Sequence, residues 1–76
     1  MEIRIGMIHV TKEIVVELSD ETDRDALKTQ INESLTGQTP TLWLTDVRGR
    51  QVGVSSQEIG YVELEGDQGE RPVGFG

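Results

Sequence analysis

Two arginines that flank a glycine, Arg48–Gly49–Arg50, are the residues in this sequence best suited to contact an anion. Guanidinium groups pair with phosphate and carboxylate oxygens, so this segment predicts a weak anion contact at the tip of a hairpin. A Walker-type phosphate loop requires Gly-x-x-x-x-Gly-Lys-Ser/Thr, but no lysine follows Lys28, and the Gly-x-Gly-x-x-Gly pattern of dinucleotide sites is also absent. We therefore favour a second interpretation, in which the segment is a solvated turn whose arginines aid solubility.

Four carboxylates lie close together before a predicted helix, and they are Asp20, Glu21, Asp23 and Asp25. A calcium loop of the EF-hand type requires glycine at its sixth position and glutamate at its twelfth. Counting from Asp20, these two positions hold Asp25 and Ile31, so the motif fails. Carboxylates also stabilise the first turn of a helix through its dipole, which accounts for the cluster. We expect no metal site and no cofactor.

Catalysis has little support among the other polar residues. His9 is the only histidine, its candidate hydroxyl partner Thr11 is simply adjacent in a predicted turn, and the chain has no cysteine. A chain of 76 residues also has little room for a core together with a concave active site. We therefore expect a protein that is not an enzyme.

Charge and composition exclude further classes of function. The net charge of -7 disfavours nucleic acid as a partner, because neutralisation of phosphates by Lys and Arg supplies most non-specific affinity. The longest apolar runs are three or four residues, whereas a membrane-spanning helix needs roughly 20. The first residues lack the basic and apolar regions of a secretory leader, so we expect no membrane association and a cytoplasmic location.

Hydrophobic periodicity predicts the elements that must position these side chains. Residues 2–8 and 12–18 alternate between apolar and polar, which is typical of two half-buried strands joined by a turn at 9–11. Residues 22–36 are predicted to form a helix with Thr22 near its cap and Gly37 after its end. Its expected apolar stripe consists of Leu27, Ile31 and Leu35.

Three further strands are predicted after the helix, at residues 41–45, 51–54 and 59–65. Asp46 and Gly49 take the first and fourth positions of a type I turn between the first two of these strands. The resulting order is β-β-α-β-β-β, an α+β fold with a mostly antiparallel sheet and one helix on one face. Residues 1–65 form the predicted single domain, and the Gly-rich residues 66–76 form a predicted mobile tail.

Strand alternation places four large apolar residues on the face of the sheet that one helix cannot cover. They are Val15, Trp43, Ile59 and Tyr61. Exposed apolar patches that contain Trp and Tyr tend to mark interaction sites, so this face is the candidate surface for a protein partner or a homodimer. Two alternatives remain open: Val73 and Phe75 of the tail cover the patch, or Trp43 only covers Gly53. An open sheet edge that accepts a partner strand is a further mode of contact.

Several segments of the sequence resemble a short actinobacterial family known as domain of unknown function 3107. They are M-E-I-R-I-G, K-E-I-V-V-E-L, L-T-D-V-R-G-R-Q-V-G-V, I-G-Y-V-E-L and the ending R-P-V-G-F-G. The resemblance spans nearly the whole chain, although the turn His9–Lys12 lacks the Ser-Pro type found in the family. Some members carry the label "ATP-binding protein", so the resemblance implies nucleotide binding as an alternative function and transfers no site residue.

Overall fold

The computed structural model describes residues 1–66 and confirms the predicted α+β fold and its order of elements. The elements are β1 (Glu2–Met7), β2 (Glu13–Glu17), α1 (Arg24–Leu35), β3 (Thr41–Thr45), β4 (Gln51–Ser55), a 3₁₀ turn (Ser56–Glu58) and β5 (Ile59–Leu64). The predicted mobile tail lies outside the described residues, except for Gly66.

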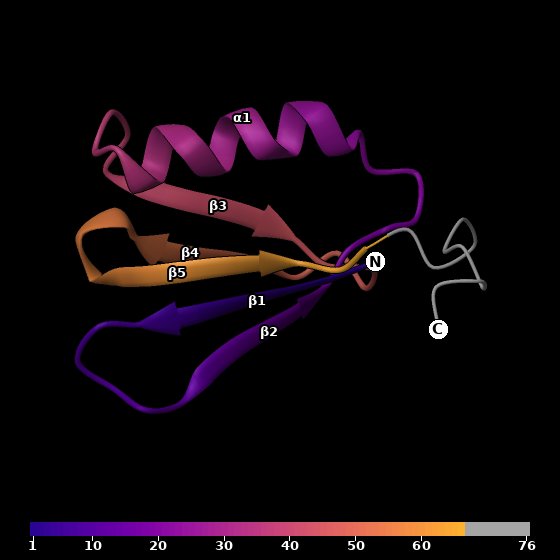
Figure 1. The fold of residues 1–76 in the computed structure, drawn as a ribbon. Coiled ribbons are helices and arrows are strands. Elements are labelled where there is room, and N and C mark those ends of the chain that lie inside the picture. Colours follow the sequence, from indigo (N-terminus) through magenta and orange to yellow (C-terminus); the bar gives the residue numbers. More distant parts are fainter. Residues whose placement is uncertain (67–76) are drawn as a thin grey trace, which may run out of the picture.

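The strands form two antiparallel sheets instead of the one sheet that we expected. One sheet has the order β2-β1-β5, and the other consists of β3 and β4 alone. Figure 1 shows α1 lying along β3, whereas β2 lies farthest from the helix. The two sheets meet at the β3–β4 tip, where the N–H group of Val47 donates to the carbonyl of Glu17 at 2.9 Å.

One hydrophobic core lies between the two sheets and the helix. Each strand contributes the apolar residues of one face, as the period of two predicts. The buried core residues are Ile3, Ile5, Val16, Leu18, Leu27, Ile31, Leu42, Leu44, Val54 and Ile59. Ile3, Ile5 and Leu42 are fully buried, so the core joins both sheets.

The helix begins two residues later than predicted because Asp23, rather than Thr22, is its N-cap. The Asp23 carboxylate accepts hydrogen bonds from the backbone N–H groups of Asp25 and Ala26 at 3.0 and 3.2 Å. Gly37 has φ +81°, which agrees with its predicted place after the helix. No helix among residues 1–66 is long and apolar enough to span a bilayer.

The predicted apolar stripe of the helix is wrong at its last member. Leu35 is exposed, and Ser34 takes the buried position of the last turn. With 3.6 residues per turn, Ser34 lies within about 20° of Leu27 around the helix axis, whereas Leu35 is rotated by about 80°. The Ser34 hydroxyl is satisfied there by the Thr39 hydroxyl at 3.2 Å.

Candidate interaction surface

The structure divides the four predicted surface residues among three environments. Val15 and Tyr61 lie on the outer face of the β2-β1-β5 sheet, and Trp43 lies on the outer face of the β3–β4 hairpin. Ile59 faces the core. The structure therefore brings only Val15 and Tyr61 onto one outer face.

Tyr61 serves mainly as a cover within its own sheet. Its ring lies against Gly6 on the neighbouring strand, and its hydroxyl donates to Glu13 two strands away. This hydrogen bond to the Glu13 carboxylate raises the pKa of the Tyr61 hydroxyl above its ordinary value. The Tyr61 hydroxyl is therefore already bonded to a carboxylate of its own sheet.

Charged residues surround Val15 on the same outer face. Val15 pairs with Arg4, and Arg4 pairs with Glu63 on the other side. The Arg4 guanidinium lies 3.2 Å from the Glu2 carboxylate and 4.0 Å from that of Glu13, and the hydrogen bond to Glu2 raises its pKa. This face is polar and acidic, so it does not form the contiguous apolar patch that we predicted.

The prediction that Ile59 faces outward is wrong, because a β-bulge interrupts the pairing of β1 with β5. Tyr61 pairs with Gly6, but Ile59 pairs with Met7, so one residue on β1 is matched by two on β5. The extra residue shifts the alternation by one position, which turns the Ile59 side chain into the core. The alternation of residues along a single strand carries no signal for such a bulge.

Trp43 is the most exposed of the large hydrophobic side chains among residues 1–66, at 59 %. It pairs with Gly53 on β4, and a Cβ atom at Gly53 would lie 2.7 Å from Cζ3 of the indole. The indole therefore lies over Gly53, as one of the two alternatives proposed. The side chain of Gln30 donates to the Trp43 carbonyl at 2.8 Å, which fastens β3 to the helix.

The outward-facing residues of the β3–β4 hairpin, here called the hairpin face, carry no charge. They are Thr41, Trp43, Thr45, Gln51, Gly53 and Ser55. A hollow of about 200 Å³ beside the indole is lined by Leu44, Thr45 and Gln51. Charged residues make up 28 % of the chain, so their absence from this face distinguishes it from the acidic face of the other sheet. Depletion of charge around an exposed Trp is typical of the centre of a protein interface.

The hairpin tip has the predicted turn, but its backbone N–H groups already donate hydrogen bonds within the chain. The Asp46 carboxylate is buried, and its Oδ1 atom accepts the backbone N–H groups of Arg50 at 2.8 Å and Arg48 at 2.9 Å. The Arg50 side chain donates to Oδ2 at 3.0 Å. These bonds, chiefly that from the Arg50 backbone, lower the pKa of Asp46. Gly49 completes the turn with φ +87° and an N–H donated to the Asp46 carbonyl.

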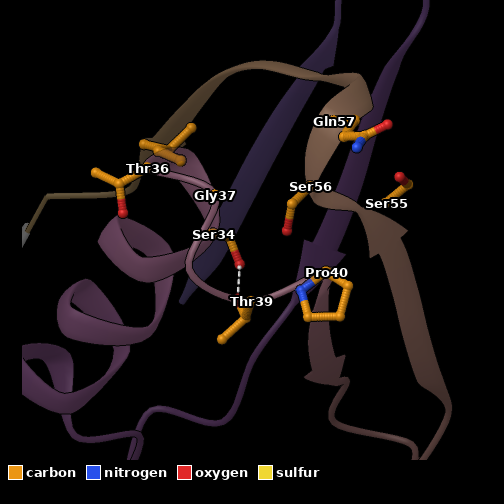
Figure 2. A pocket seen from close by; sticks show the side chains of 9 residues that line it. Ser34, Thr36, Gly37, Thr39, Pro40, Ser55, Ser56 and Gln57 are labelled. Carbon is orange, nitrogen blue, oxygen red and sulfur yellow. Dashed lines mark hydrogen bonds between the residues drawn. The ribbon is translucent and has the colours of Figure 1, made fainter.

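A second hollow, of about 620 Å³, lies between the end of α1 and the 3₁₀ turn (Figure 2). Ser34, Thr39 and Ser56 contribute hydroxyl groups, and no lining side chain is charged. The Ser56 hydroxyl is buried and has no hydrogen-bond partner among residues 1–66. The hollow offers hydrogen bonds, but its lining has neither an acid nor a base.

The residues weighed above for metal binding and catalysis lie apart from one another, at a helix cap, at the N-terminus and in a loop. Asp23 caps the helix, Asp20 accepts a hydrogen bond from the amino group of Met1 at 2.9 Å, and His9 is exposed in the β1–β2 loop. Within residues 1–66, no three His, Asp or Glu side chains gather as a metal site would require.

Comparison with known families places the chain in a family without assigning it a function. The family model described as "Protein of unknown function (DUF3107)" matches residues 1–76, the full length of the chain. No curated protein matches the chain. The chain therefore belongs to the DUF3107 family of proteins of unknown function.

Proposed function

We propose that this protein is a non-enzymatic interaction module that contacts another polypeptide through the hairpin face. The observation that carries this proposal is the exposed indole of Trp43 at the middle of a surface without charge. Removing uncharged groups from water costs less free energy than removing charged ones. A partner can therefore cover the hairpin face at a lower desolvation cost than the charged outer face of the other sheet.

The contacts that hold Trp43 within the hairpin also support this proposal. Trp43 rests on Gly53, and its own backbone is held to α1 by Gln30. A side chain that packs on its own sheet before binding loses less conformational entropy on binding than one without such a contact, so more of its buried apolar area contributes to affinity. Tyr61 is held by such contacts as well, but it lies among the charged groups of the other sheet.

The alternative function is nucleotide binding at Arg48–Gly49–Arg50. A phosphate at this tip would use backbone N–H groups and guanidinium groups together. The Asp46 carboxylate already accepts two of these backbone groups and the Arg50 side chain, and its negative charge repels a phosphate. The geometry of the tip therefore favours the interaction module.

Titration with magnesium–ATP separates the two functions. We expect the amide resonances of residues 47–51 to stay unmoved in a proton–nitrogen correlation spectrum, because the tip donors remain bonded to Asp46. Saturable shifts confined to those residues would support nucleotide binding instead.

Site-specific photocrosslinking in the native host tests the interaction module. A benzophenone amino acid at Gln51 samples the hairpin face, and the same amino acid at Glu63 samples the outer face of the other sheet. We expect a discrete crosslinked product from Gln51 and none from Glu63. Absence of a product from Gln51, or equal products from both positions, would contradict the proposal.

A further inference from the structure

The outer edge of β4 presents backbone groups that no strand within residues 1–66 pairs with. Hydrogen bonds from Asp46 to Arg50 and from Ser56 to Pro40 close the two ends of the hairpin ladder. In an antiparallel pair the bonding residues alternate, so the N–H and C=O groups of Gln51, Gly53 and Ser55 point away from β3. Among residues 1–66, no strand pairs with this edge of β4.

The other strand edges differ in how they are protected. The outer edge of β3 is covered in part by α1, whose Gln30 side chain bonds the Trp43 carbonyl. The edge strands β2 and β5 carry carboxylates (Glu13, Glu17 and Glu63), and charges of this kind discourage pairing with another chain. The helix α1 also contacts β5. By contrast, β4 has the sequence Q-V-G-V-S, with neither charge nor proline, and an uninterrupted register with β3. Such an edge is a ready template for a further strand.

We propose that a second copy of this chain pairs with β4 in antiparallel orientation, with Gly53 opposite Gly53 of the second copy. This inference rests on the proposed function, because β4 carries half of the hairpin face, and it names the partner that meets the edge of that face. Gln51 and Ser55 then lie opposite each other across the two-fold axis, so every outward backbone group of the three residues finds a partner. The two hairpins become one continuous four-stranded sheet.

Charge complementarity favours a second copy in this orientation. Arg48 and Arg50 come just before β4, and the carboxylate of Asp46 offsets one of these two positive charges. Glu58 lies just beyond the other end of the strand. An antiparallel pair brings the Arg50 end of each strand toward the Glu58 end of the other, whereas a parallel pair would place like charges together. The uncharged hairpin face also keeps carboxylates away from the contact, which reduces the repulsion between two chains of net charge -7.

The position of Trp43 provides a reporter of this contact. Its indole leans across the hairpin onto Gly53, the residue at the proposed two-fold axis. The two indoles would lie on the same face of the combined sheet, close to the axis. Trp43 is the only tryptophan, so its fluorescence emission should move to shorter wavelength as dimerisation removes water from the ring.

Ser55→Pro tests the pairing with little effect on the monomer. Ser55 has φ -63°, which proline adopts, and its N–H group points away from β3, so only the outward hydrogen bond is lost. Ser55→Ala is the matched control, because it retains the N–H group. Gln51→Pro, at the first position of β4, is a second variant of the same design for use if Ser55→Pro alters the unfolding transition.

Analytical ultracentrifugation of the full chain measures the outcome. We expect a monomer–dimer equilibrium for the wild type and for Ser55→Ala, and at least about a tenfold weaker association for a folded Ser55→Pro variant, equivalent to about 1.4 kcal/mol. A wild-type protein that stays monomeric at all concentrations, or equal association of Ser55→Pro and Ser55→Ala, would overturn the dimer.

The crosslinking experiment at Gln51 distinguishes failure of the dimer from failure of the proposed function. A product with twice the mass of the chain supports the dimer. A discrete product of another mass, from a chain that is monomeric by itself, rejects the dimer and leaves the interaction module intact. No product from Gln51 rejects both.

Discussion

Replacing Ile59 by alanine is expected to lower the free energy of unfolding by about 2–4 kcal/mol. The β-bulge opposite Gly6 and Met7 turns this side chain into the core, where it is 9 % exposed. Truncation removes buried apolar atoms and leaves a cavity, and both effects destabilise the folded state. Urea denaturation followed by circular dichroism measures the change.

Val15→Ala is the control for this substitution, because Val15 is also apolar and lies in a strand but is 48 % exposed. We expect its effect to stay within about 0.5 kcal/mol, as for most surface positions. Equal effects of Ile59→Ala and Val15→Ala would contradict this account. They would mean that the bulge is absent and that Ile59 lies on the outer surface, as simple alternation along β5 predicts.

The second large effect is expected in the helix, where Leu27→Ala should lower the free energy of unfolding by about 2–4 kcal/mol. Leu35→Ala removes the same atoms from the same helix, but Leu35 is 45 % exposed, and we expect a loss below about 1 kcal/mol. Thermal and urea unfolding of both variants measure the difference. A larger loss for Leu35→Ala than for Leu27→Ala would contradict the observed rotation of α1.

Local patterns were sufficient to predict most of the elements. Alternation of apolar residues depends only on neighbours along the chain, so the strands near Ile5, Val16 and Leu42 were predicted with their correct faces. The turn at Asp46 was also predictable, because a side chain that accepts backbone N–H groups two and four residues later is a local device. The exposed position of Trp43 followed from the same alternation.

Pairing between distant segments was not predictable from these patterns. The bulge at Ile59 depends on how β5 meets β1, more than fifty residues earlier in the chain. The division into two sheets depends on pairings of the same long range. These two features removed Ile59 from the predicted surface and separated Trp43 from Val15.

The two aromatic residues within residues 1–66 show why the candidate surface could not be identified without the fold. Tyr61 and Trp43 each cover a glycine on a paired strand, Gly6 and Gly53, so their local sequences carry similar signals. Only the surroundings differ. The hydroxyl of Tyr61 bonds Glu13 on an acidic face, whereas Trp43 lies among uncharged residues beside an open strand edge. The placement of charge around an aromatic ring, rather than the ring itself, identifies the candidate surface.

The most direct measurement of the central claim is whether the crosslinked product from Gln51 depends on Trp43. We expect Trp43→Ala to abolish the product, because it removes the apolar centre of the hairpin face. Tyr61→Ala is the matched control on the other sheet and should leave the product unchanged. Retention of the product in a folded Trp43→Ala variant, or its loss in a folded Tyr61→Ala variant, would contradict the claim that the hairpin face is the interaction surface.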